Sequence, residues 1–256
     1  MNYGVIEGKR ETDYLGGTLP YEVRTNGDWT PYLPSGETQT NSKIDYMSCV
    51  TYSALNSIEA QYRFLTGKEI NLSDRFTAKM SGTTPQGNYL YAVADSIRKD
   101  GVVPEEEWPT NISYTWEQHY ADIPQSVKDK AKEFLKDWEV TYEWIDFDRM
   151  EIMKHLKHAP IQVTIPGHAV LCFYTEEQVS KYFDSYAPYI KERTLPFVSA
   201  MKIVLNKKMT KDEVTKLYKL AFYRLPDAEE LAYWTGKSLD TFLSTAIADR
   251  AKFLSQ

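Results

Sequence analysis

The sequence is poor in cysteine, with only Cys49 and Cys172 in 256 residues. So few cysteines exclude a disulfide framework, and they leave a choice between inert buried thiols and a reactive one. The chain also lacks any apolar run near the roughly 18 residues that a membrane span needs. Residues 1–17 lack the basic and then apolar order of a secretory signal peptide. These absences predict a chain without a membrane partner.

Basic charge is also scarce relative to acidic charge. The chain has 30 Lys and Arg residues against 36 Asp and Glu residues, and its formal net charge is -6. No cluster of basic residues supplies the electrostatic footprint of a nucleic-acid-binding surface, so we expect no nucleic-acid partner. Hydrophobic residues make up 42% of the chain, which is enough for one large core and a small appendage.

Helical patterns fill the first half of the chain. Residues 1–48 are rich in Gly, Pro, Thr and Asn and have no sustained period, so they read as an extended arm. From Cys49 onward, apolar residues recur at three- and four-residue spacing until Gly67, which predicts a long helix in a core position. Amphipathic patterns at 71–101 and 126–138 predict three further helices.

The second half of the chain changes to β-forming patterns. Residues 139–147 alternate as a strand does, and 148–159 predict another helix. Four short segments rich in β-formers follow, PIQVTI, HAVLCFY, YFDSY and FVSAMKIVL. Residues 208–256 return to helical spacing, with Thr210 as a cap and Pro226-Asp227 at the start of a second helix. The pattern predicts an α+β fold in which a helical half meets a sheet half, followed by a helical appendage.

Cys49 is the candidate nucleophile because of its position. A cysteine in the first turn of a helix lies where unpaired N–H groups and the helix dipole favour the thiolate, which predicts a lowered pKa. Such a nucleophile also needs a base and a group that orients the base. His168, at a predicted strand start, and Asp184, in the next predicted strand, are the candidates for these two roles. A hydrogen-bonded structural histidine is the alternative interpretation of His168.

The sequence around Cys49 resembles a known signature. CVTYSALNSIEA is similar to CWAFSAxxxIE, which surrounds the nucleophile in the papain family of cysteine peptidases, and five positions match, namely Cys49, Ser53, Ala54, Ile58 and Glu59. Further segments resemble that family in the same order: Asp28-Trp29 near the start, LSDRF at 72–76, GNYLYAVADSIRKDGVVPEEEWP, APIQVTIPGHAVLCFY and YFDSY. The resemblance covers about residues 19–206.

The resemblance implies a papain-like fold with a central helix starting at Cys49, and three parts: an arm at 1–18, a papain-like domain at 19–207 and the appendage at 208–256. It implies thiol peptidase activity on a polypeptide substrate, with Cys49 as nucleophile and His168 as base. The family's orienting asparagine is replaced by Asp184, whose carboxylate suits the same role. The family's oxyanion-hole glutamine falls at Lys43, so we assign that role to Gln39 and expect a longer loop at 41–47.

Other residues suggest weaker alternatives. His155, His158, His168 and Cys172 are residue types that bind zinc, but the first two lie at a predicted helix end where cations are favourable. We therefore predict no metal and no cofactor. Cys172 lies in an apolar run typical of a buried thiol, and Glu59 is expected to be a structural hydrogen-bonding group.

The departures from the family pattern leave a second hypothesis open. The altered oxyanion loop and the lack of a long inhibitory prosegment fit an inactive structural or interaction protein with a papain-like fold, such as a phage particle component. The segment LYKLAFYRLPDAEELAYWTG resembles a small helical module of bacterial surface and phage-encoded proteins, which implies docking to another protein. A plain two-helix hairpin is the alternative. We expect a cytoplasmic location or assembly into a virion.

Overall fold

A computed structural model describes residues 4–10, 12–13, 23–41, 43–176, 179–194, 197–239, 241–243 and 245. The helices are η1 (Thr30–Tyr32), α1 (Cys49–Thr66), α2 (Asp74–Met80), α3 (Leu90–Asp100), η2 (Glu105–Glu107), α4 (Trp116–His119), α5 (Gln125–Asp137), α6 (Arg149–Leu156), α7 (Lys211–Phe222) and α8 (Ala228–Trp234). The strands are β1 (Trp138–Ile145), β2 (Ile161–Ile165), β3 (His168–Thr175), β4 (Ser180–Phe183), β5 (Ile190–Arg193) and β6 (Ser199–Lys207).

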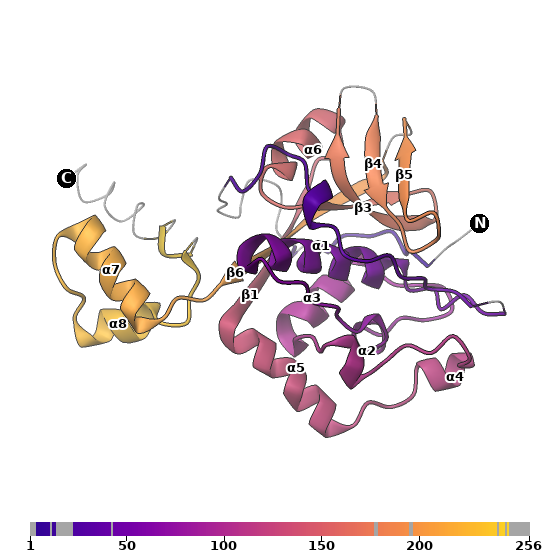
Figure 1. The fold of residues 1–256 in the computed structure, drawn as a ribbon, viewed down its shortest axis with the longest axis horizontal. Coiled ribbons are helices and arrows are strands. Elements are labelled where there is room, and N and C mark those ends of the chain that lie inside the picture. Colours follow the sequence, from indigo (N-terminus) through magenta and orange to yellow (C-terminus); the bar gives the residue numbers. More distant parts are fainter. Residues whose placement is uncertain are drawn as a thin grey trace.

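Helix α1 lies at the junction between the other helices and the sheet (Figure 1). It is buried on almost all sides from Cys49 to Gln61, as its apolar composition predicts. Gly67 ends the helix in a left-handed conformation, φ +70°, and donates its N–H to the Arg63 carbonyl at 2.8 Å. Glycine suits this position because it lacks the Cβ that disfavours positive φ.

The six strands form one antiparallel sheet in the order β1-β6-β2-β3-β4-β5. The strands predicted from the five β-rich segments are confirmed within it. Strand β5 was not predicted, because IKER carries no apolar alternation and its side chains are mostly exposed at the edge of the sheet. The α+β class with a helical half packed on an antiparallel half is confirmed.

Two apolar clusters pack against the sheet. One joins α1 and α3 to β1 and β6, and Cys49 and Ala169 belong to it. The other lies between the sheet, α6 and η1, with Trp29 fully buried and its Nε1 donating to the Leu156 carbonyl at 2.6 Å. Burial of apolar surface at about 25 cal/mol per Å² makes such clusters the main stabilising contribution. They hold α1 against the sheet.

The C-terminal helices have an apolar cluster of their own, formed by Met209, Val214, Tyr218, Trp234 and Phe242. Thr210 caps α7 and Asp227 caps α8, as predicted, each in a reciprocal capping box. Beyond the end of β6, Lys208 joins this part to the main body through its Nζ, which donates to the Leu135 carbonyl at 2.6 Å. The two helices lie at the far side of the molecule from α4 (Figure 1). No helix in the described part of the chain is long and apolar enough to cross a membrane.

Candidate active site

The loop before α1 fixes the position of Cys49. Met47, two residues earlier, has a left-handed backbone with φ +54°. The carboxylate of Asp45 accepts the Met47 N–H at 2.8 Å, a local bond of the kind that stabilises such turns. On the sheet side, the Gln162 side-chain amide donates to the Val50 carbonyl at 2.8 Å. The first turn of α1 is therefore held both by its own loop and by β2.

Strand β3 brings His168 into the region of Cys49. A turn at Pro166-Gly167, with φ +74° at the glycine, reverses the chain between β2 and β3, and β3 begins at His168. The backbone N–H of Ala169 donates to Sγ of Cys49 at 3.4 Å. Because Ala169 directly follows His168, the start of β3 lies against the start of α1.

Asp184 contacts His168 as the sequence predicts. It follows the end of β4, and its Oδ1 lies 2.8 Å from Nε2 of His168. Its Oδ2 accepts a hydrogen bond from Nζ of Lys191 in β5 at 2.7 Å. Burial acts to raise the pKa of Asp184, but the bonds from His168 and Lys191 outweigh it and hold the pKa below its usual value. The carboxylate is therefore charged at neutral pH.

A second polar network lies beside this pair. Nε2 of Gln39 donates to Asp45 Oδ1 and to the Tyr186 hydroxyl, both at 2.8 Å, and its Oε1 accepts from Ser185 at 2.8 Å. The Tyr186 hydroxyl also donates to the Asp45 carboxylate. The Tyr186 ring lies 5.4 Å from the His168 ring, measured between ring centroids. Gln39 thus lies near the site, but the two N–H bonds of its amide are both engaged.

The loop between Gln39 and Cys49 is folded back on itself at its start. Thr40 pairs with Asp45 across it, and the Asn41 N–H donates to the Ile44 carbonyl at 2.9 Å. These contacts form the base of a small excursion from the loop, in which Lys43 is exposed. Lys43 is not among the hydrogen-bond partners of the network around Gln39 in the described residues.

The expected lowering of the Cys49 pKa is wrong for this closed conformation. Burial raises the pKa of the thiol to about 12, and the carboxylates of Asp45 and Asp184 add to the effect. Cys49 is 0% exposed, so a thiolate there would lack hydration by water. This desolvation cost outweighs the favourable effect of the helix N-terminus on the thiolate. The thiol is neutral while the site is closed.

The weaker sequence candidates take structural positions. Burial lowers the pKa of His155 to about 4, with Lys202 adding to the effect. Cys172 is fully buried in β3, and burial raises its pKa to about 12. His158 is buried beyond the end of α6. Within the described ranges, no group of three or more His, Cys, Asp or Glu side chains is arranged to hold a metal ion.

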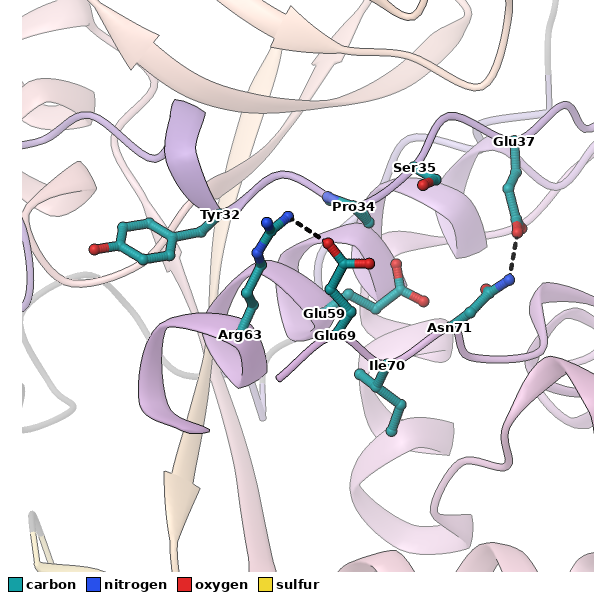
Figure 2. Close-up of a pocket in the computed structure, with 9 residues that line it drawn as sticks. All are labelled: Tyr32, Pro34, Ser35, Glu37, Glu59, Arg63, Glu69, Ile70 and Asn71. Atoms are coloured by element: carbon teal, nitrogen blue, oxygen red, sulfur yellow. Dashed lines mark hydrogen bonds and ion pairs between the residues drawn. The ribbon is translucent and has the colours of Figure 1, made fainter. Parts of the chain in front are cut away.

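A separate pocket lies towards the other end of α1 (Figure 2). It is lined by Tyr32, Pro34, Ser35, Glu37, Glu59, Arg63, Glu69, Ile70 and Asn71. Two polar contacts join residues that line this pocket. Arg63 forms an ion pair with Glu69 at 2.9 Å, and the Asn71 side-chain amide donates a hydrogen bond to the Glu37 carboxylate at 2.6 Å. Glu59 is almost fully buried and accepts the Leu72 N–H at 2.6 Å, the structural role expected from the sequence. None of the lining residues belongs to the Cys49 site.

Sequence reasoning missed Lys191 and Asp45. Lys191 lies in a polar edge strand, so no hydrophobic pattern distinguishes it from other surface lysines. Asp45 lies in the excursion, whose fold depends on contacts with Tyr186 that are distant in sequence. The only available signal was position, since Asp45 falls between the predicted oxyanion donor and the predicted nucleophile.

The fold is similar to that of known cysteine proteases. Xylellain, a cysteine protease from Xylella fastidiosa, superposes with a TM-score of 0.56 and 16% identity over 79% of this chain and 96% of its own. Digestive procathepsin L 3 of Tenebrio molitor larval midgut has a TM-score of 0.53 and 14% identity over 79% and 76%. A recombinant stem bromelain precursor has a TM-score of 0.52 and 13% identity over 75% and 77%.

These similarities show the fold and no more, because the identities are low. No family model matches the sequence, and no curated protein matches it either. The chain has a papain-like fold, as its sequence signature predicts.

Proposed function

We propose that this chain is a thiol peptidase in which Cys49 is the nucleophile, His168 the general base and Asp184 the group that orients the base. The observation that carries the proposal is that the start of β3 lies against the thiol and that its first residue, His168, bonds to Asp184. Sγ of Cys49 contacts the N–H of Ala169, and the neighbouring His168 contacts Asp184 through Nε2. A nucleophile, a base and an orienting acid in this order are the requirement for nucleophilic acyl transfer.

In the acylation half, the orientation of His168 decides which nitrogen reacts. Because Nε2 bonds to Asp184, Nδ1 is the nitrogen that takes the proton from the Cys49 thiol. Sγ then bonds to the peptide carbonyl carbon, and the carbonyl π electrons move to oxygen. When the tetrahedral intermediate collapses, the C–N bond breaks and the imidazolium gives its proton to the leaving amine. A thioester on Cys49 remains.

In the deacylation half, His168 removes a proton from water while the resulting hydroxide attacks the thioester carbonyl. Collapse breaks the C–S bond, releases a carboxylic acid and returns the proton to the thiolate. Asp184 stays ionised throughout and stabilises the imidazolium that forms in each half. Its lowered pKa fits this role.

For oxyanion stabilisation, we propose the Cys49 backbone N–H and the side-chain amide of Gln39. Both N–H bonds of that amide are engaged by Asp45 and Tyr186. The substrate oxygen therefore has to replace one of these acceptors during the reaction. One such donor contributes about 100- to 1000-fold to turnover, which is sufficient to favour the exchange in the transition state.

The complete burial of Cys49 favours a second candidate function. A papain-like protein whose thiol stays covered is a binding or structural protein, and residues 208–256 are then a docking element for another protein. The buried pairing of His168 with the ionised carboxylate of Asp184 argues for the peptidase, because a purely structural histidine does not require a lysine-supported carboxylate. We give the peptidase precedence on this ground.

Covalent labelling tests the proposal. The folded protein is incubated with excess peptidyl epoxide, and the adduct is located by mass spectrometry in the wild type and in His168→Ala. We expect an adduct at Cys49 that is lost in His168→Ala, with none at the equally buried Cys172. If a small alkylating reagent modifies Cys49 but the epoxide does not, or if His168→Ala labels equally fast, the thiol is not activated and the proposal fails.

A further inference from the structure

Asp45 lies between two residues of the proposed site, six residues after Gln39 and four residues before Cys49. It belongs to the small excursion before α1, at whose base Thr40 and Asp45 form an antiparallel bridge. Its side chain is half-buried. A carboxylate at this point can contact both the proposed oxyanion donor and the turn that leads to the nucleophile.

Two donors fix the Asp45 carboxylate in place. Its Oδ1 accepts the Met47 backbone N–H at 2.8 Å, and this bond closes the left-handed turn, φ +54°, that precedes α1. Its Oδ2 accepts the hydroxyl proton of Tyr186, which is 141 residues away in the sequence. The acid is therefore held by one local contact and by one contact from the sheet half of the chain.

The fixed carboxylate in turn holds the side chain of Gln39, which is 0% exposed. Nε2 of Gln39 donates to Asp45 Oδ1 at 2.8 Å. The Tyr186 hydroxyl gives its own proton to Asp45, so it accepts the second N–H of the same amide, at 2.8 Å. Both N–H bonds of Gln39 are thus directed by the acid, one by direct contact and one through the hydroxyl that the acid orients.

The chemistry of the partners decides which end of the Gln39 amide lies on which side. A carboxylate only accepts hydrogen bonds, so Asp45 can face the N–H end of the amide but not its carbonyl end. The Ser185 hydroxyl, which donates to Gln39 Oε1 at 2.8 Å, can either donate or accept and does not impose an orientation by itself. Asp45 is therefore the partner that orients the amide.

We infer that Asp45 is a positioning residue for the acyl-transfer reaction, which acts by fixing the orientation of the Gln39 amide, the proposed side-chain donor to the oxyanion. It acts through Gln39 and is not itself a catalytic group. The effect on the reaction rests on the proposed peptidase function, because an oxyanion forms only if Cys49 attacks a carbonyl group. The hold of Asp45 on the Gln39 amide does not depend on that function.

The kinetic test compares Asp45→Ala with Asp45→Asn in the full-length protein, by kcat and KM for peptide hydrolysis. Asp45→Ala removes the acceptor. In Asp45→Asn, the Met47 N–H requires an oxygen at the position of Oδ1, so the asparagine still presents an acceptor to Gln39. Lys43→Ala is the matched control, because Lys43 is exposed in the same loop.

We expect Asp45→Ala to lower kcat by about 100-fold with little change in KM, because an oxyanion donor acts in the transition state. Asp45→Asn should recover most of this loss, and Lys43→Ala should behave as the wild type. Asp45→Ala combined with Gln39→Leu should be no slower than Gln39→Leu alone, because the two residues act as a unit. A slower double variant, an Asp45→Asn protein as slow as Asp45→Ala, or a change in KM alone overturns the inference.

A second measurement separates this inference from the peptidase proposal. Hydrogen exchange of the Gln39 side-chain amide, followed by NMR, should be slow in the wild type and in Asp45→Asn, and at least about tenfold faster in Asp45→Ala. Exchange that stays equally slow in Asp45→Ala overturns the inference, whatever the kinetics show. If the exchange follows the expected pattern but the wild type cleaves no peptide, the peptidase proposal fails and the hold of Asp45 on Gln39 stands.

Discussion

Oδ1 of Asp184 lies 2.8 Å from Nε2 of His168, while Oδ2 of the same carboxylate lies 2.7 Å from Nζ of Lys191. One buried acid therefore joins the start of β3 to the edge strand β5. Its two partners keep it charged in a place where burial alone would favour the neutral form. The orientation of the proposed base depends on this single carboxylate.

Asp184→Asn is expected to lower stability at neutral pH but not in acid. Because the folded pKa of Asp184 is depressed, its contribution is present above the unfolded value of about 3.9 and is lost as the pH falls through the folded value. Urea unfolding should show a less stable variant at neutral pH and convergence with the wild type in acid. The exposed Asp122 serves as control, with Asp122→Asn showing no such convergence. A difference that does not change with pH contradicts the prediction.

Tyr186→Phe is expected to raise kcat for peptide hydrolysis, because it releases one N–H of Gln39 for the oxyanion and keeps the ring beside His168. Gln39→Leu should instead lower kcat by about 100-fold. Tyr182→Phe is the control, since the buried Tyr182 hydroxyl has no hydrogen-bond partner among the described residues. Both effects are measured against the wild-type parent. Equal kcat values for Gln39→Leu and its parent would remove Gln39 from the mechanism.

Lys202 and Glu143 form an ion pair with both side chains fully buried, in adjacent positions of β6 and β1. Lys202→Met leaves a buried carboxylate without its cation, and we expect a loss of about 3–5 kcal/mol in the free energy of unfolding. The double variant Lys202→Met with Glu143→Leu should recover most of this loss, because an apolar pair carries no desolvation cost. A double variant as unstable as the sum of the single ones would show that the pair is not coupled.

Glu59→Gln is expected to stabilise the protein at neutral pH. Burial, with Glu37 and Glu105 adding to it, raises the Glu59 pKa well above its usual value despite the bond from Leu72. A raised folded pKa means that stability is full below the unfolded value of about 4.3 and falls as the pH rises through the folded value. The uncharged amide in Glu59→Gln does not have this pH-dependent loss of stability. The variant's gain in stability over the wild type should therefore vanish in acid. Glu69→Gln, in the same pocket but 67% exposed, is the control and should show no such gain.

Local sequence patterns were sufficient for the elements that carry the site. The apolar spacing after Cys49 and the glycine at 67 predicted α1, and its observed bounds agree. The β-forming runs predicted β3 and β4, which are adjacent and antiparallel, so that the proximity of His168 and Asp184 followed. These inferences succeed because helix and strand periods are local properties of the chain.

Contacts between distant segments were not predictable in this way. The bond from Lys191 to Asp184, the engagement of Gln39 by Asp45 and Tyr186, and the contact of Gly4 with Met47 each join segments whose patterns are independent. The prediction that the Cys49 pKa is lowered was wrong for the same reason, because the burial that raises it depends on which distant segments cover the thiol.

Peptide hydrolysis by the folded protein tests the central claim most directly. A mixture of unmodified peptides is incubated with the wild type and with Cys49→Ser, and new termini are identified by mass spectrometry. The proposed site predicts cleavage that requires Cys49 and disappears in Cys49→Ser. A wild-type protein whose Cys49 reacts with iodoacetamide but which cleaves no peptide, or cleavage that survives Cys49→Ser, would contradict it.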